Sequence, residues 1–138
     1  MARHTTDCGV ILLVEDSIPL LRNAAFLLEI SGYKVFTATN GVEGLSTLRR
    51  QRPDLIVSDI EMPQMDGYQF LQAVRADRRW RTIPFVFISG KYELDDLMYG
   101  LDLGADDYLP KPFDIYDLLD VIERTLPRIA DDRQQKAG

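Results

Sequence analysis

Five polar side chains stand where apolar runs of this sequence end, and their types suit chemistry on phosphate groups. Glu15 and Asp16 follow the first such run, Asp59 follows a later one, and Ser89 and Lys111 follow the last two. Runs of this length between helix-like segments are typical of buried parallel strands, whose carboxyl ends meet at one edge of a sheet. We therefore expect these side chains to lie close together at that edge.

Three of the five side chains are carboxylates, which repel one another when they are close and raise the pKa of at least one of the group. A hard divalent cation relieves this repulsion, and Mg²⁺ suits a site of one or two carboxylates, waters and a phosphate oxygen. A lysine ammonium can hold a phosphate oxygen without competing as a metal ligand, and a serine hydroxyl can donate a hydrogen bond to one. The sequence therefore predicts a Mg²⁺ site that handles a phosphate group.

The segments that must position these residues alternate between strand-like and helix-like patterns. The helix-like segments carry apolar residues at helical spacing, three of them begin after Ser17, Asn40 or Asp114, and Gly32 and Gly104 end two of them. Short links between alternating strands and helices imply right-handed crossovers and a parallel sheet with helices on both faces. The strand-like runs are residues 10–14, 34–38, 55–57, 83–88 and 108–109.

Length, charge and cysteine content narrow the class of protein. With 138 residues, 46% of them hydrophobic, the chain is expected to form one domain with a single core. Its net charge of -6 opposes attraction to nucleic acid or to anionic lipid. Cys8 is the only cysteine, which rules out an internal disulfide and indicates a reducing compartment. No run has the length and hydropathy of a signal or a membrane span, so a cytoplasmic location is predicted.

Several motifs in the same order resemble the receiver domains of two-component response regulators. They are VEDS at 14–17, SDIEMPQMDG at 58–67, ISG at 88–90 and GADDYLPKPF at 104–113. The resemblance covers residues 9–126 and implies a flavodoxin-like, doubly wound α/β fold whose five-stranded parallel sheet has the order 2-1-3-4-5, with five helices. Residues 1–8 would then be a mobile N-terminal tail, and residues 127–138 a polar tail or the stump of a linker.

The resemblance also implies how the acidic residues act. Asp59 would accept a phosphoryl group from the phosphohistidine of a sensor histidine kinase or a phosphotransfer protein, giving an aspartyl phosphate. Asp16 and Asp59 would bind Mg²⁺ directly, the backbone carbonyl of Glu61 would be a further ligand, and Glu15 would act through a bound water. The domain would catalyse only its own phosphorylation and dephosphorylation, and is not expected to be an enzyme in any other sense.

The remaining site residues would hold the transferred group and report its arrival. Lys111 and Ser89 would contact the phosphoryl oxygens, helped by the backbone N–H groups of Ile60 and Gly90. Ser89 would move toward the new phosphoryl group, and the ring of Tyr108 would turn into the space it leaves, so that these two form the switch. The altered surface would meet a downstream effector or a fused output domain, and a homodimer stays open. Direct contact with nucleic acid or membrane is not expected.

Alternative interpretations accompany these assignments. A metal-dependent phosphohydrolase would also use Asp59, Mg²⁺ and a lysine, but dehalogenase-like enzymes carry a second aspartate where this chain has Glu61. A pseudo-receiver that only docks proteins would usually lack part of the acidic set. Asp16 taken alone fits helix capping as well as metal binding, and Tyr108 alone fits a half-buried core residue. We also hypothesise that Glu61 and Lys91 pair across the mouth of the site and prolong the phosphorylated state.

Two further expectations concern residues outside the site. The apolar residues Leu97, Met98 and Leu101 are spaced as the core-facing side of a helix, so we expect them to be buried. Trp80 lies among arginines, a pattern found in nucleic-acid patches but more often in a solvated basic turn, and the acidic total favours the turn. Tyr99 is a candidate for a partner-facing surface.

Overall fold

A computed structural model describes residues 8–90 and 94–126, and its centre is a sheet of five parallel strands in the order β2-β1-β3-β4-β5. This is the expected flavodoxin-like order. The strands are β1 (Val10–Val14), β2 (Lys34–Ala38), β3 (Leu55–Asp59), β4 (Phe85–Ser89) and β5 (Asp107–Pro110). The helices are α1 (Ile18–Ile30), α2 (Gly41–Arg50), α3 (Gly67–Ala76), α4 (Leu94–Asp102) and α5 (Ile115–Thr125).

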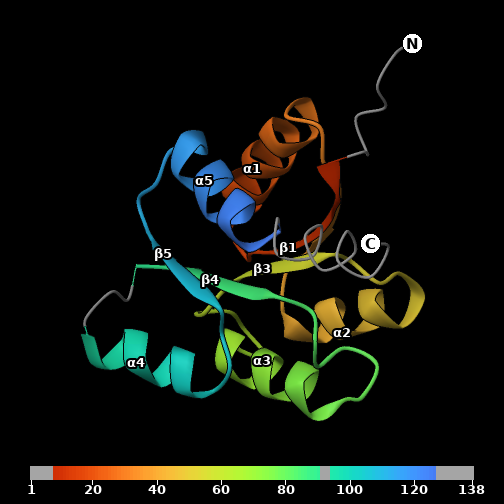
Figure 1. Cartoon of the computed structure of the whole chain (residues 1–138), viewed down its shortest axis with the longest axis vertical. Coiled ribbons are helices and arrows are strands. Elements are labelled where there is room, and N and C mark those ends of the chain that lie inside the picture. Colours follow the sequence, from red (N-terminus) through yellow and green to blue (C-terminus); the bar gives the residue numbers. More distant parts are fainter. Residues whose placement is uncertain (1–7, 91–93, 127–138) are drawn as a thin grey trace, which may run out of the picture.

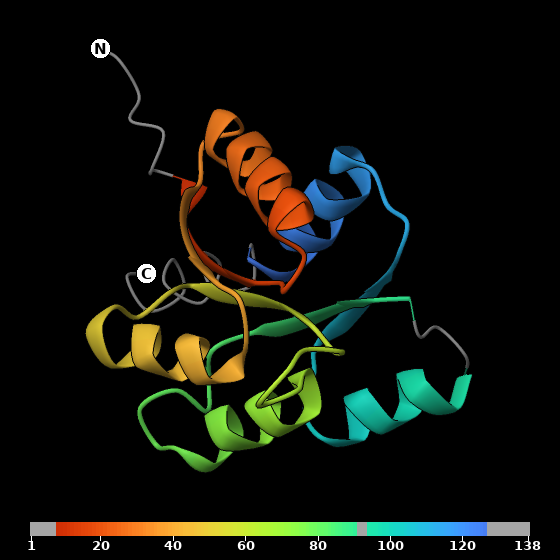
Figure 2. The ribbon, with the colours of Figure 1, turned by 180° about the vertical axis from the view of Figure 1, so that it is seen from behind.

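The helices form two layers, one on each face of the sheet. Figure 1 shows α1 and α5 together on one face and α2, α3 and α4 on the other, and Figure 2 shows the same division from behind. The side chains of β1 are buried on both faces of the sheet. Ile11 and Leu13 pack into the cluster beneath α1 and α5, whereas Leu12 and Val14 pack into the cluster on the opposite face. Adjacent side chains of a strand point to opposite faces, so an unbroken apolar run is what a sheet buried on both sides requires.

The helix starts follow the capping chemistry expected from the sequence, with one difference. Asn40 accepts a hydrogen bond from the backbone N–H of Glu43, and Asp114 forms a reciprocal capping box with Asp117. Ser17 occupies the N-cap position of α1, but its side chain makes no capping bond. Its backbone N–H instead donates to the Glu15 carboxylate at 2.9 Å, so the start of α1 is tied to the acidic end of β1.

The expected burial of the α4 side chains is wrong for two of the three residues. Met98 is 52% exposed and Leu101 is 49% exposed, while Leu97 is half-buried. Gly100 is the buried residue of this helix, and a Cβ placed there would lie 3.1 Å from the ring of Phe87. The helix therefore approaches the sheet through a glycine, and its larger apolar side chains are displaced toward solvent.

Some expectations lie outside the described residues. These are Lys91, residues 1–7 of the expected N-terminal tail and residues 127–138 of the expected C-terminal tail. Trp80 is described and buried, so its indole is part of the core beneath the basic turn. In the described part of the chain, no helix combines the length and hydropathy that crossing a bilayer requires.

Candidate functional site: an acidic pocket at the carboxyl edge of the sheet

The register of the strands brings the expected site residues to one edge. Asp59 is the last residue of β3 and pairs with Ile88 of β4, while Ser89 at the end of β4 pairs with Pro110 of β5. Glu15 follows β1 directly, and its backbone N–H donates to Ala38 at the end of β2. Parallel pairing without a slip therefore places the ends of β1, β3, β4 and β5 side by side.

The three carboxylates converge as expected. One oxygen from each of Glu15, Asp16 and Asp59 lies within 4.8 Å of the others. Glu15 is 1% exposed and Asp59 is 4% exposed, whereas Asp16 faces solvent. Asp59 Oδ1 accepts a hydrogen bond of 2.7 Å from the N–H of Ile60, which fixes the orientation of this carboxylate.

Lys111 reaches into this pocket from the segment after β5. Its Nζ lies 3.2 Å from Asp59 Oδ2, where it donates a hydrogen bond, and 2.7 Å from Glu15 Oε1. The contact with Glu15 is a close ion pair, so the ammonium faces both buried carboxylates at once. The backbone N–H of Lys111 donates to the carbonyl of Ser89 at 2.8 Å, which holds the lysine beside the end of β4.

Burial and mutual charge shift the pKa values of these groups. Desolvation by burial raises the pKa of Asp59, and Lys111 and the Ile60 N–H only partly offset it. Burial likewise raises the pKa of Glu15 against the opposing effect of Lys111, and the Asp59 charge adds to the rise. Burial opposes the charge on Lys111, but its contacts with Glu15 and Asp59 outweigh this and raise its pKa. The pocket thus holds excess negative charge that a single ammonium offsets incompletely.

The donor set of this pocket fits a hard divalent cation. It offers carboxylate oxygens from two strand ends, and one of the three residues, Asp16, is open to solvent. Oxygen ligands with room for water are what Mg²⁺ prefers. The described residues therefore support a metal site at the position predicted from the sequence.

The loop after β3 is held tightly against the end of that strand. The N–H of Gly67 donates to the carbonyl of Ile60 at 2.7 Å, and a Cβ at Gly67 would lie 2.3 Å from the carbonyl oxygen of Asp59. Asp66 caps α3 through a capping box with Gln69, which fixes the far end of the loop. Glu61 is exposed between these anchors.

Tyr108 lies next to Ser89, as the expected switch pair requires. The Ser89 side chain is fully buried, and the ring of Tyr108 packs edge-on against Phe87 at 6.4 Å between centroids. The Tyr108 hydroxyl oxygen is itself buried. Burial raises the pKa of Tyr108, and the neighbouring Ser89 hydroxyl opposes that rise.

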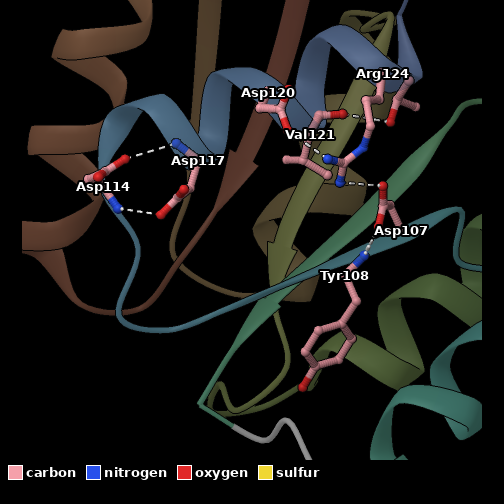
Figure 3. Close-up of polar contacts among 8 residues, drawn as sticks. Asp107, Tyr108, Asp114, Asp117, Asp120, Val121 and Arg124 are labelled. Carbon is pink, nitrogen blue, oxygen red and sulfur yellow. Dashed lines mark hydrogen bonds and ion pairs between the residues drawn. The ribbon is translucent and has the colours of Figure 1, made fainter.

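The backbone of Tyr108 is anchored to α5 through two charged residues. Arg124 donates to Asp107 Oδ2 at 3.0 Å, and Asp107 Oδ1 accepts the N–H of Tyr108 at 2.8 Å (Figure 3). Figure 3 also shows the ring of Tyr108 directed away from this anchor. The backbone of β5 is therefore fixed at this point, while the ring lies on the side that faces Phe87.

One neighbour of Ser89 and Tyr108, the expected switch pair, could not be predicted from the sequence. Tyr68 packs edge-on against Phe87 and against Tyr99, with centroid distances of 5.5 Å and 4.7 Å. Its hydroxyl is buried and makes no hydrogen bond with any other residue that the structure describes. Burial raises the pKa of Tyr68 to about 12. A single tyrosine in an amphipathic helix carries no pattern that predicts such a cluster. Only the packing of α3 against α4 assembles it.

Comparison with known proteins gives a consistent result. Residues 11–123 match the family model described as the response regulator receiver domain. The chain is 40% identical over 119 residues to the response regulator Rre1 of Synechocystis sp., covering 86% of this chain and 52% of that protein. It is 38% identical over 126 residues to the transcriptional regulatory protein PrrA of Mycobacterium tuberculosis, covering 88% of this chain and 53% of that protein. The chain thus spans about half the length of these relatives.

Solved structures of similar proteins have the same fold. The chemotaxis response regulator CheY4 of Vibrio cholerae matches with a TM-score of 0.80 and 33% identity, covering 84% of this chain and 97% of that chain. The signal receiver domain of a signal transduction histidine kinase from Syntrophus aciditrophicus matches with a TM-score of 0.81 and 36% identity, covering 88% and 92%. The similarity therefore extends over nearly all of the described residues.

Proposed function

The chain belongs to the response regulator receiver domain family, whose members are phospho-accepting signalling domains, and on that premise we propose that Asp59 is its phosphoryl acceptor. The observation that carries the proposal is the position of Lys111. Its ammonium lies within 3.2 Å of Asp59 and 2.7 Å of Glu15, although these three residues come from distant parts of the sequence. A lysine between two buried carboxylates is suited to hold the oxygens of an incoming phosphoryl group.

In the proposed reaction the Asp59 carboxylate attacks the phosphorus atom of a phosphohistidine. A bond forms between phosphorus and the Asp59 oxygen, the bond from phosphorus to the imidazole nitrogen breaks, and that nitrogen leaves with the electron pair. Because a carboxylate is already a nucleophile, no separate base is needed. The Ile60 N–H orients the carboxylate. Lys111, Ser89 and the N–H groups of Ile60 and Gly90 would hold the phosphoryl oxygens.

We propose Mg²⁺ as the cofactor, held by Asp16, Asp59 and the Glu61 carbonyl, with Glu15 acting through water. The convergence of the three carboxylate oxygens within 4.8 Å supports this assignment. When bound, the ion would supply positive charge that neutralises the negative oxygens of the transferring group. The same residues would later release phosphate by hydrolysis, so the chemistry of the domain is confined to its own phosphorylation and dephosphorylation.

The readout we propose uses Ser89 and Tyr108, whose contact is described above. A phosphoryl group adds roughly two negative charges and new acceptor oxygens, which would draw the Ser89 hydroxyl toward Asp59. Tyr108 would then shift its preferred packing, and the surface around α4 and β5 would change with it.

The partners and boundaries remain part of this proposal. A sensor histidine kinase or phosphotransfer protein would donate the group, and an effector or a fused output domain would read it. The chain spans about half the length of its relatives, and one of these is named a DNA-binding regulator. Nucleic-acid binding would therefore belong to such an output domain and not to the receiver. Residues 9–126 would be the folded receiver, which the family match over residues 11–123 supports. A cytoplasmic location stays a prediction.

Intact-mass measurement tests the acceptor directly. After incubation with Mg²⁺ and acetyl phosphate, the wild-type chain should gain the mass of one phosphoryl group, and Asp59→Asn should gain none. Asp102→Asn makes the same chemical change at an exposed position on α4 and should behave as wild type. Phosphorylation of the Asp59→Asn variant at the wild-type level would show that another residue is the acceptor.

A further inference from the structure

Helix α1 presents an apolar surface on the side that faces the free edge strand β2. Phe26 is 60% exposed, Ile30 is 64% exposed and Ile18 is 41% exposed. Between α1 and β2 lies an open hollow of about 480 Å³. Its lining includes Ile18, Arg22, Phe26, Glu29, Val35 and Thr37. Side chains this large are normally covered when several occur together, so this surface is a candidate for an interface.

This surface is separate from the phosphoryl site. Leu20 of α1 lines a different hollow with Lys111 and Phe113. Since a helix turns 100° per residue, Leu20 lies on the opposite side of α1 from Ile18 and Arg22. Figure 2 shows α5 on the side of α1 that is away from β2, so no described helix lies on the side toward β2. A partner on that side would leave the acidic pocket open.

One positive and one negative side chain lie on either side of Phe26, so the charge pattern of this surface is complementary to that of a second, antiparallel copy. Arg22 lies one turn before Phe26, and Glu29 lies about one turn after it, all on one stripe of the helix. In the described part of the chain, the side chains of Arg22 and Glu29 take part in no ion pair or hydrogen bond with another residue. A two-fold axis through the middle of α1, near Ala25 and Phe26, would place each Arg22 opposite the other copy's Glu29.

We propose that the α1–β2 surface binds a second copy of this chain, with the two α1 helices antiparallel. Each Phe26 ring would enter the hollow of the other copy, between α1 and Val35 and Thr37 of β2. Removal of the exposed apolar side chains from water would drive association. The two Arg22–Glu29 pairs would set the antiparallel register, because a parallel arrangement would place like charges together. Such an interface has the same surface patch on both copies.

Sedimentation of the full chain over a range of concentrations tests the proposal. The contact is small, so we expect a dissociation constant on the order of 10–100 μM, the weak end for specific interfaces. Phe26→Ala should weaken dimer formation at least tenfold. A wild-type chain that sediments as a monomer at millimolar concentration would overturn the proposal.

Charge exchange then identifies the surface. Arg22→Glu places two glutamates opposite each other and Glu29→Arg places two arginines opposite each other, so each variant alone should be monomeric. An equimolar mixture should form a heterodimer, because both pairs become opposite in charge again, and the double variant should recover the homodimer. Arg50→Glu, at the exposed end of α2, is the matched control and should dimerise as wild type.

The readouts separate loss of the interface from loss of the fold. Each variant should retain wild-type circular dichroism and wild-type phosphorylation by acetyl phosphate, since Arg22 and Glu29 lie away from Asp59. If the single variants are monomeric and their mixture is monomeric too, pairing of Arg22 with Glu29 is excluded and the proposed arrangement is wrong. Single variants that still dimerise would likewise place the interface elsewhere.

Discussion

Lys111 offsets part of the negative charge of the pocket, because its ammonium lies between two carboxylates whose charged forms burial disfavours. Desolvation raises the pKa of both Asp59 and Glu15, and Lys111 is the cation that opposes this effect for each. A buried charge that loses its partner keeps the cost of desolvation. Removing the ammonium therefore leaves two uncompensated acids and, in the proposed reaction, would also take away a group that holds the incoming phosphoryl oxygens.

We predict that Lys111→Met lowers the rate of Asp59 phosphorylation by acetyl phosphate by about 10²–10³-fold, the usual cost of losing one donor to developing charge. Methionine keeps most of the length of the side chain but removes the charge. Lys34→Met, on the exposed side of the edge strand β2, should leave the rate unchanged. A rate for Lys111→Met within twofold of wild type would mean that the lysine does not touch the transferred group.

Asp77, which directly follows α3, is predicted to have a low pKa that depends on Arg79. Hydrogen bonds from the side chain and backbone of Arg79 lower the pKa of Asp77 to about 2. Because this pKa is lower in the folded state than the ordinary value of about 3.9, any stabilisation from the pair is present above pH 4 and is lost as the pH falls toward 2. An NMR titration should show this low pKa, and Arg79→Gln should move it toward the ordinary value. An unchanged pKa in that variant would refute the assignment to Arg79.

At the scale of elements, glycines decide how closely helices approach the sheet. Gly67 begins α3 next to the carbonyl of Asp59. A Cβ at Gly67 would lie only 2.3 Å from that carbonyl oxygen, and because the oxygen belongs to the backbone, no change of side-chain rotamer could relieve the clash. The carbonyl belongs to the proposed acceptor itself. The start of α3 and the orientation of the acceptor strand are therefore coupled.

We predict that Gly67→Ala destabilises the domain by about 1–3 kcal/mol, the typical cost of overpacking, and also slows phosphorylation. Chemical denaturation should show the first effect and the acetyl phosphate reaction the second. Gly90→Ala makes the same substitution where a Cβ meets no atom of the described residues within 4 Å, so its unfolding free energy should equal that of wild type. Equal stability of the two variants would contradict the close approach of α3.

The elements themselves could be predicted from the sequence because local signals agree with the fold. Asn40 and Asp114 cap helices where the apolar pattern changes period, and the strand run at residues 55–57 is apolar on both faces. The exposure of Met98 and Leu101 could not be predicted, because their spacing alone fits a buried helix face. What decides it is the approach of Gly100 to Phe87, a contact between residues from different elements.

The convergence of the site residues could be predicted because it follows from the topology of the whole sheet. In a parallel sheet with short right-handed connections, every strand delivers the residue after its end to the same edge, so chain position alone brings Glu15, Asp59 and Lys111 together. No comparable rule of topology predicts the aromatic contacts of Tyr68 or the self-complementary surface of α1. Both depend on which helix faces stay exposed once the helices have packed on the sheet.

Because the pocket is assembled from three distant segments, it exists only when the whole chain is folded, and an ion that binds it must stabilise the fold. We predict that Mg²⁺ raises the melting temperature in a saturable way and that EDTA reverses the rise. At about 100 times the dissociation constant the gain should be about 2.7 kcal/mol.

The variant for this test is Asp16→Asn, which removes the solvent-facing ligand and leaves the buried pair Glu15 and Asp59 with Lys111. The Mg²⁺ concentration that gives half of the maximal rise in melting temperature should increase at least tenfold in this variant. Asp102→Asn should keep the wild-type concentration. Sodium chloride at equal ionic strength should not reproduce the effect, because screening acts on surface charge everywhere and not on one site. An Asp16→Asn variant with the wild-type half-maximal concentration would show that the stabilising ion binds elsewhere, and that the convergence of acidic strand ends is not what holds the metal.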